Sequence, residues 1–362
     1  MRITRSHVVA ALAAAVFPAL ASAQVSLENL QIHGYLTQGY VDASQRAAAG
    51  IPTDPTGDYR VAALQFRYAA TDNDAVIVQL RHRRIGTSPI MAGESDVTLN
   101  WAFYQHNFGG TKVKVGRLPA PKGIFSEIRS VGTLLPFYRA PYNFYAEGFE
   151  TVDGASIARS FSYKSWSLDG SAFGGGWAVR IPYTLPNGTT TVIDARLERT
   201  YGGQVWLNTP IQGLRVGVNG MRYRSRKATD TSTTPESSSW GASLDGDFSR
   251  FTLRSEYSNT SLSSNGHLLA YYGQAGVKVT SKLSINAQDD IGDQNARTGT
   301  APRVFWRNVR DFAVGANYQL NPQLALKLEK HDLKGYNFDK PIAISGAPQK
   351  GKYVIASVAA SF

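Results

Sequence analysis

Apolar and polar side chains alternate with a period of two along most of this chain. Between residues 62 and 68, the apolar side chains occupy the even positions, whereas Gln65 and Arg67 occupy odd ones. Further segments with this alternation are 76–83, 99–104, 240–245, 251–257 and 324–329. A period of two indicates β-strands that have one apolar and one polar face. In segment 99–104 the pattern places Leu99, Trp101 and Phe103 on the apolar face.

Tight turns and longer connections separate these segments in regular alternation. Asn, Asp, Gly, Pro and Ser dominate the short segments, because turn geometry favours these residues. The seven expected turns are 71–74, 108–111, 163–165, 209–213, 246–249, 280–282 and 320–323. The eight longer connections are expected at 43–57, 86–95, 117–151, 176–196, 227–237, 261–266, 293–307 and 335–350.

Eight long and seven short connections join sixteen antiparallel strands, with both chain ends on the short-turn side. Short periplasmic turns opposite long extracellular loops are typical of outer-membrane barrels. We therefore predict an all-β fold, a transmembrane antiparallel β-barrel with its apolar face outside. Counts of 14 or 18 strands stay open, since strand boundaries read from sequence vary by a few residues.

A soluble β-sandwich would also alternate, but with its polar face outside. Aromatic residues near the expected strand ends favour the barrel, because such residues form girdles at membrane interfaces. They are Tyr40, Tyr104, Tyr163, Trp166, Trp206, Tyr257, Tyr318 and Tyr353.

The segment 215–226 departs from the pattern. Val216 and Val218 share a parity with three arginines, Arg222, Arg224 and Arg226. Two explanations stay open. Either a β-bulge at Gly220 turns the arginines inward, or they project outward above the membrane toward anionic headgroups.

The N-terminus has the pattern of a secretory signal peptide. Arg2 and Arg5 precede an apolar stretch from Val8 to Leu20, and residues 21–23 have the small-x-small form of a cleavage site. We therefore expect residues 1–23 to be removed near Ala23 and residues 24–362 to form one barrel domain in the cell outer membrane.

Composition narrows the chemistry further. The chain has no cysteine, which excludes disulfides and thiolate metal sites. The formal charge of +11 includes Arg2 and Arg5 and leaves +9 on the mature chain. An exported protein does not meet nucleic acid, so this charge does not indicate nucleic-acid binding. No cofactor or metal site is expected, because the spacing of Asp289, Asp290 and Asp293 matches no recognised calcium site.

The last strand carries the most specific pattern. Residues 353–362 alternate and end in Phe362. This segment resembles the carboxy-terminal signature of outer-membrane proteins, which the barrel assembly machinery recognises. The whole mature chain resembles the Gram-negative porins, although its first strand, 33–40, only loosely resembles that of general porins. The resemblance implies a passive channel for small hydrophilic solutes, surrounded by outer-membrane lipid and lipopolysaccharide. It also implies a homotrimer, although no residue identifies a contact face.

The longest early connection, 117–151, resembles the third extracellular loop of general porins, which folds into the lumen and narrows it. Its Gly-Arg, Pro, Gly, Glu and Arg string also resembles a less studied group of proteobacterial porin-like proteins. Prolines stiffen the segment, and Ile124, Phe125 and Ile128 supply apolar anchoring surface. The charged residues expected at a constriction are Arg117, Lys122, Glu127, Arg129 and Arg139.

Charge on the polar face of the strands indicates selectivity. The basic residues expected to face the constriction are Arg67, Arg81, Arg83, Lys112 and Lys114. Because rings of basic side chains favour anions in a narrow passage, we predict a weak anion preference. The alternative is that the surplus basic residues lie on the surface and bind lipopolysaccharide.

A barrel enzyme or an adhesin that acts through its loops is the other class of function. The sequence contains no Gly-x-Ser-x-Gly elbow, no His-Glu-x-x-His helix and no phosphate-binding glycine loop. We therefore predict a channel without enzymatic activity.

Overall fold

The computed structural model describes residues 27–85, 96–145, 148–184, 190–227, 236–262, 266–296, 302–336 and 338–362. The expected signal peptide, 1–23, lies outside these residues and stays a prediction. Within the described part of the chain, no helix is both long and apolar enough to span a bilayer.

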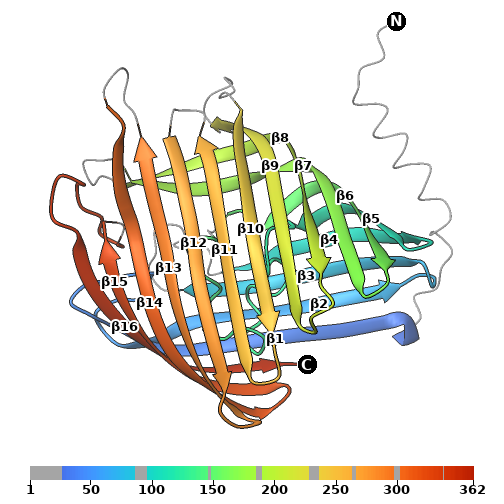
Figure 1. Ribbon diagram of the computed structural model, residues 1–362, viewed down its shortest axis with the longest axis horizontal. Helices are drawn as coiled ribbons and strands as arrows, with labels where there is room; N and C mark the ends of the chain where they lie inside the picture. The colour runs from blue at the N-terminus through green and yellow to red at the C-terminus, as the bar shows by residue number, and fades with distance from the viewer. Residues whose placement is uncertain are drawn as a thin grey trace, which may run out of the picture.

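Sixteen antiparallel strands form a closed barrel in which each strand pairs with its neighbours in sequence (Figure 1). This confirms the predicted fold class and strand count. A short 3-10 helix, Leu27–Asn29, precedes the first strand. The strands are β1 (Leu30–Ser44), β2 (Thr56–Ala69), β3 (Asp74–Ile85), β4 (Val97–Phe108), β5 (Thr111–Pro119), β6 (Thr151–Tyr163), β7 (Trp166–Thr184), β8 (Thr190–Asn208), β9 (Leu214–Lys227), β10 (Ser237–Asp247), β11 (Phe251–Leu262), β12 (Gly266–Lys278), β13 (Leu283–Ala296), β14 (Val304–Asn321), β15 (Leu324–Gly335) and β16 (Gln349–Ser361).

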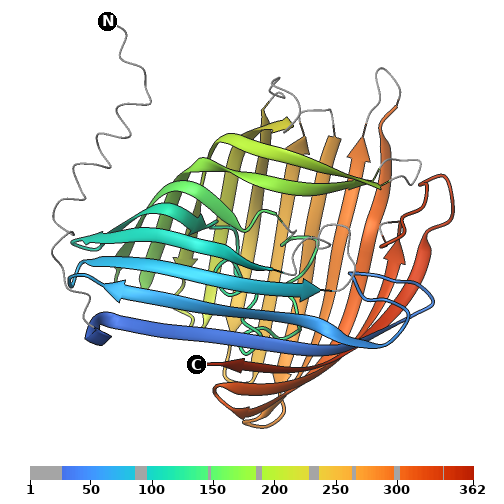
Figure 2. The same cartoon turned by 180° about the vertical axis from the view of Figure 1, so that it is seen from behind.

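The first and last strands close the barrel. Strand β16 pairs with β1, and the blue and red strands lie side by side in Figure 2. Gly34 and Phe362 exchange two backbone hydrogen bonds of 3.0 Å, which extends the ladder to the last residue. The terminal residue therefore belongs to the wall, and the barrel has no unpaired edge.

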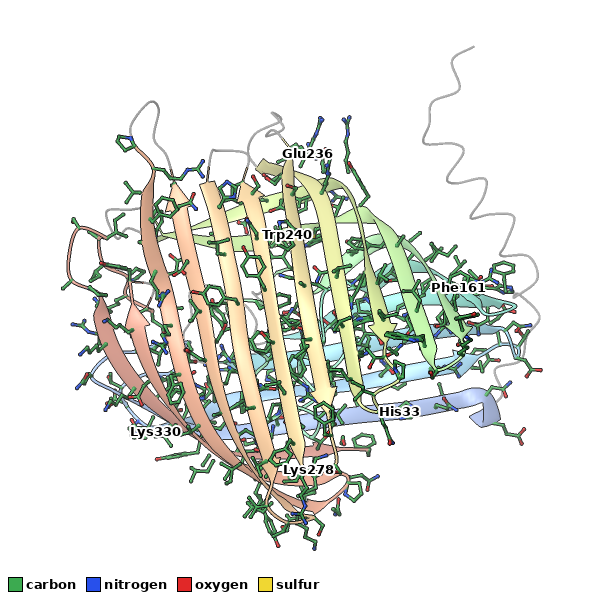
Figure 3. All side chains as sticks on the ribbon, viewed as in Figure 1. His33, Phe161, Glu236, Trp240, Lys278 and Lys330 are labelled. Atoms are coloured by element: carbon green, nitrogen blue, oxygen red, sulfur yellow. The ribbon has the colours of Figure 1, made fainter. Side chains whose placement is uncertain are left out.

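Seven of the connections are short, as predicted, and they lie at one end of the barrel. Figure 3 shows the two ends: Lys278 lies at the short-turn end, and Glu236 lies at the opposite end. The fourth of the expected long connections is shorter than predicted. Strands β7 and β8 continue to Thr184 and from Thr190, so most of the expected loop 176–196 belongs to the wall.

Glycines explain this error. Gly154, Gly175 and their neighbours lie where strands β6 and β7 approach closely: a Cβ on Gly154 would lie 2.0 Å from the carbonyl oxygen of Gly174, and one on Gly175 would lie 2.3 Å from that of Asp153. Only glycine fits such a contact without displacing the backbone. A glycine-rich run that indicates a loop in most sequences here permits a tightly packed, bulged wall.

The outward face of the strands carries an apolar band. On β15, Leu324, Leu326 and Leu328 face outward from the short-turn end, and Lys330 follows on the same face. Trp240, with 54% of its surface exposed, lies on the outer face of β10 (Figure 3). A band of this kind, with polar residues on the lumen side, is typical of transmembrane barrels.

Strand β4 differs from the sequence prediction. Trp101 and Phe103 face the lumen, where Phe103 packs with Ile77 and Leu118, whereas Leu99 faces outward. A β-bulge beside Asn100 adds one residue to β4 and reverses the parity beyond it. Two of the expected girdle aromatics, Trp206 and Tyr353, also face the lumen and are less than one tenth exposed.

The structure decides between the two explanations for segment 215–226. Arg222 pairs in register with the outward Tyr201, and Arg224 pairs with Glu198. The three arginines therefore project outward, in line with Val216 and Val218. The bulge in this region lies in β8, between Glu198 and Tyr201, and not at Gly220.

Candidate constriction site

The third long connection, between β5 and β6, lies inside the barrel (Figure 2). We refer to its described residues, 120–145 and 148–150, as the lumen loop. Phe125, Leu135, Phe137 and Phe144 of this loop are at most 2% exposed. Such burial is possible only if the loop packs against the inner wall, as the sequence predicted.

Glu256 on β11 holds the first limb of the lumen loop. Its carboxylate accepts a hydrogen bond from the backbone N–H of Ile124 at 3.0 Å and another from the hydroxyl of Tyr145. The hydroxyls of Ser243 and Tyr272, both on the wall, donate to the same carboxylate at 2.6 and 2.7 Å. Four donors around one carboxylate compensate for its burial.

Gly123 lies beside this contact. Its φ of +77° is in the left-handed region, and a Cβ there would lie 2.2 Å from Oε1 of Glu256. Its backbone N–H donates to Oε1 of Gln204 on β8 at 3.2 Å. The glycine thus allows the loop backbone to touch two wall strands at one point.

The second limb is held on the other side of the lumen. The Nζ atom of Lys327 on β15 donates to the carbonyl oxygens of Leu135 at 2.7 Å and Phe137 at 3.0 Å. The carboxylate of Asp290 on β13 accepts from the backbone N–H of Asn143 at 3.0 Å. Charged lumen residues on three strands therefore bind loop backbone rather than face water.

Arginines gather where the lumen loop meets strand β3. Glu150, at the end of the loop, accepts from Nη1 of Arg83 at 2.9 Å and also pairs with Arg81. Arg129 approaches the same carboxylate at 3.7 Å and donates to the carbonyl oxygen of Tyr145. Among the described residues, three guanidinium groups thus gather around the carboxylate of Glu150.

Arg139 extends this positive region. Its Nη2 donates to the carbonyl oxygen of Ala49 at 3.1 Å, and its guanidinium lies over the ring of Tyr59 at 5.3 Å. Asp339 is the nearby carboxylate, and it accepts from the backbone N–H of Gly50 at 3.0 Å. Burial raises the pKa of Asp339, and the Gly50 hydrogen bond and the charge of Arg139 oppose this shift.

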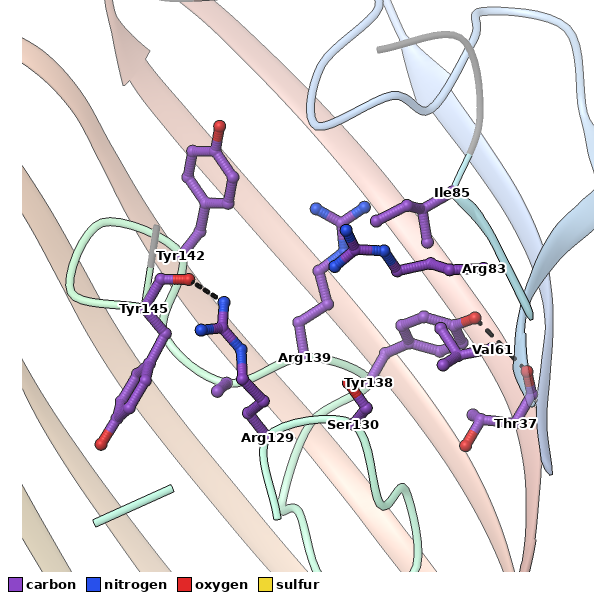
Figure 4. Close-up of a pocket in the computed structure, with 11 residues that line it drawn as sticks. Thr37, Val61, Arg83, Ile85, Arg129, Ser130, Tyr138, Arg139, Tyr142 and Tyr145 are labelled. Atoms are coloured by element: carbon purple, nitrogen blue, oxygen red, sulfur yellow. Dashed lines mark hydrogen bonds between the residues drawn. The ribbon is translucent and has the colours of Figure 1, made fainter. Parts of the chain in front are cut away.

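A pocket of about 30 Å³ lies among these groups (Figure 4). Arg83 reaches it from the wall, and Arg129 and Arg139 reach it from the lumen loop. Tyr138, Tyr142 and Tyr145 complete the loop side. A small opening lined by three guanidinium groups and by tyrosines favours anions.

Lys122 lies near a second pocket, which is lined by Phe149, Trp177 and Met221 on the side of strands β7–β10. Its Nζ donates to the carbonyl oxygen of Phe144 at 2.8 Å. Burial, and secondarily the charge of Arg129, lowers the pKa of Lys122 to about 8.

The remaining expected constriction residues do not join this cluster. Lys114 faces the lumen and lies 3.3 Å from Glu127, whose side chain is 63% exposed. Arg67 and Lys112 lie on the lumen side nearer the short-turn end, and Arg67 reaches Gln31 at 3.5 Å. The structure thus separates them from Arg81, Arg83, Arg129 and Arg139.

The placement of Arg117 was wrong. Strand β5 extends to Pro119, so Arg117 is part of the wall and not of the loop. Leu118 is buried on the lumen side, and alternation therefore turns Arg117 outward, where it pairs with Asp153 at 3.2 Å. The three aspartates considered for calcium do not share a face, because Asp289 and Asp293 face outward and Asp290 faces the lumen.

Sequence reasoning missed Glu150 and the three tyrosines. Glu150 directly precedes β6, and no local pattern indicates that it would meet β3, which lies far away in sequence. Lys327, Glu256 and Asp290 were also missed as loop contacts, because their bonds to loop backbone depend on how the loop folds.

The fold agrees with that of known porins. DcaP, an outer-membrane channel of Acinetobacter baumannii, matches with a TM-score of 0.59 at 10% identity, over 92% of this chain and 97% of that chain. The anion-selective porin of Comamonas acidovorans matches with 0.57 at 13%, over 92% and 99%. In-vitro folded OmpT of Vibrio cholerae, in trimer form, matches with 0.53 at 11%, over 92% and 99%. No family model matches the sequence, and neither does any curated protein.

These matches establish the class of structure. The chain has the sixteen-stranded barrel fold of the Gram-negative outer-membrane porins, with a loop folded into the lumen.

Proposed function

We propose that this protein is a passive outer-membrane channel for small hydrophilic solutes and that it prefers anions. The observation that carries this proposal is the arginine cluster at the lumen loop. Arg81, Arg83 and Arg129 share the carboxylate of Glu150, and Arg139 adds a fourth guanidinium group next to the same pocket. Positive charge at a narrow point lowers the barrier for anions and raises it for cations.

The fold supports a location in the outer membrane and an orientation with the short turns on the periplasmic side. In outer-membrane barrels the short turns face the periplasm and the long loops face the outside. We place the protein in the outer membrane accordingly, after removal of residues 1–23, with the arginine cluster between the extracellular mouth and the periplasmic turns. OmpT of Vibrio cholerae is described as a trimer, and we propose the same assembly for this chain.

Transport through such a channel requires no catalytic group, and we propose no enzymatic activity. Loop-based adhesion has no supporting observation among the described residues, whereas the channel has the lumen loop and its arginines.

Reversal potentials in planar bilayers test the selectivity. Under a tenfold gradient of potassium chloride, we expect the reversal potential to have the sign of the chloride equilibrium potential. A reversal potential of the opposite sign would refute the anion proposal. Uptake of graded sugars into proteoliposomes tests the channel itself, and the absence of uptake by folded protein would refute it.

A further inference from the structure

The outer wall of strands β8–β11 contains an apolar groove of about 510 Å³. Four outward side chains of β8 and β9 line one side, and outward residues of β10 and β11 line the other. They are Val205, Leu207, Val216, Val218, Ala242, Leu244, Ser255 and Tyr257. Its volume lies within the range of small-molecule sites. The small side chains Ala242 and Ser255 leave the space that larger neighbours fill elsewhere in the band.

Toward the long-connection end of the barrel, the outward face beyond this groove becomes basic. Along β9, Val216 and Val218 are followed by Gly220 and then by Arg222, Arg224 and Arg226. Arg222 lies four residues beyond Val218, which is about 13 Å along a strand. The arginines lie at the end of β9 that leads into a long connection. In the orientation proposed above, this end is the extracellular one.

Carboxylates compensate for only part of this charge. Arg226 pairs with Glu198 at 2.6 Å, and Arg222 pairs with Glu236 at 3.3 Å, with 61% of the Arg222 side chain exposed. Within the described part of the chain, Arg224 has no carboxylate within ion-pair distance. Arg196 and Arg199 add positive charge on β8, and Asp194 reduces it.

Two aromatic residues lie where the apolar face meets the arginines. Tyr201 pairs in register with Arg222, and Trp240 pairs with Gly220. Both face outward and are more than half exposed. Exposed aromatic residues on a barrel lie at the boundary between hydrocarbon and headgroups. The groove therefore lies at the depth of acyl chains, and the arginines lie at the depth of headgroups.

We propose that this face binds one phosphorylated glycolipid of the outer leaflet, the lipid A part of lipopolysaccharide. An acyl chain occupies the groove, and a phosphate binds at Arg222 and Arg224. Guanidinium groups bind phosphate through paired, charge-assisted hydrogen bonds, and an apolar groove binds a chain. The proposal rests on the outer-membrane location and orientation proposed above, but not on the ion selectivity.

Native mass spectrometry of the full mature protein tests this site. The probes are bisphosphorylated lipid A, the same lipid without phosphates, and phosphatidylethanolamine. Wild-type protein is expected to retain bisphosphorylated lipid A about tenfold better than the other two, a difference of the size that charge-assisted contacts produce.

Three variants assign the binding to this face. Arg222→Gln with Arg224→Gln is expected to lower retention of bisphosphorylated lipid A about tenfold. Ala242→Phe fills the groove with apolar volume and should lower retention of both lipid A probes. The matched control, Lys330→Gln with Lys334→Gln, removes two outward charges from β15, away from the groove, and should change neither.

Equal retention of phosphorylated and phosphate-free lipid A would refute the headgroup contact, and equal losses in the control and the arginine variant would refute the site. If Ala242→Phe changes the number of chains in the complex and leaves lipid retention intact, the groove is an interface between copies and the proposal fails. Single-channel conductance of the same preparations shows whether each variant is folded, and it separates failure of this site from failure of the channel proposal.

Discussion

The Nη1 atom of Arg83 on wall strand β3 lies 2.9 Å from Oε1 of Glu150 at the end of the lumen loop. The side chains are 7% and 9% exposed, so water screens the pair weakly. This contact fixes the distance between loop and wall beside the arginine pocket. It also lowers the positive charge there, because Arg81 and Arg129 pair with the same carboxylate.

The first prediction concerns selectivity. Glu150→Gln removes negative charge from the cluster and should raise the chloride-to-potassium permeability ratio, whereas Arg129→Gln should lower it. Each change is expected to be about two- to fivefold, which corresponds to about 0.5–1 kcal/mol for an ion passing one unit charge. Reversal potentials in planar bilayers measure the ratio.

Arg117→Gln is the control for this prediction. Arg117 also begins the third connection in sequence, but it faces outward and pairs with Asp153. Its replacement should leave the ratio unchanged. A shift equal to that of Arg129→Gln would mean that the cluster does not determine selectivity.

The second prediction concerns the fixation of the lumen loop. Lys327→Met removes the donor to the carbonyl oxygens of Leu135 and Phe137 and leaves both without this hydrogen bond. Buried polar groups that lose a partner destabilise a protein by about 1–3 kcal/mol each. We expect a lower melting temperature, measured by heat-modifiability on gels, and faster proteolysis of the loop. Lys330→Met, on the outward face of the same strand, should have little effect; similar losses in both variants would contradict the anchoring role.

The third prediction concerns the glycine-rich wall. Gly154→Ala would place a Cβ 2.0 Å from the carbonyl oxygen of Gly174, so the backbone must shift. Overpacking of this kind costs about 1–3 kcal/mol and should reduce the folded fraction after refolding into detergent. Gly273→Ala is the matched control, since a Cβ there meets no atom within 4 Å. Equal folded fractions for the two variants would show that the strands do not approach as closely as described.

The fourth prediction concerns pH. Because the pKa of Lys122 is lowered to about 8, this ammonium group is charged at pH 7 and loses its proton as the pH rises through 8. Anion preference should therefore fall between about pH 7 and pH 9, by less than Arg129→Gln produces, because one charge disappears beside the second pocket. Lys122→Gln should abolish this step in reversal-potential titrations. A step of unchanged size in the variant would assign it to another group.

Local patterns were sufficient for most of the wall. Alternation and turn residues predicted sixteen strands and all seven short turns, because each depends on neighbours in sequence. Two of the errors in the wall have local causes that the pattern hides. The bulge beside Asn100 adds one residue and reverses the faces of Trp101 and Phe103, and the glycines of β7 lie in a strand rather than in a loop.

The candidate site was predicted only in part. The loop and its arginines were identified from composition, and Arg81, Arg83, Arg129 and Arg139 do meet. Arg117 was misplaced because one step of parity decides whether a strand residue faces the lumen or the membrane. Glu150 was missed because Arg81 and Arg83, its partners on β3, are distant from it in sequence.

The barrel could be predicted from the amino-acid sequence, because strand periodicity, turns and the terminal Phe362 act between residues that are near one another in the chain or in register. Which charged side chains lie at the pocket depends on tertiary contacts. Arg83, Arg129 and Arg139 line the pocket, whereas Lys327 and Glu256 bind loop backbone and are not part of the lining. The physical reason is that burial and pairing depend on the path of the loop across the lumen, which brings together residues that are distant in sequence.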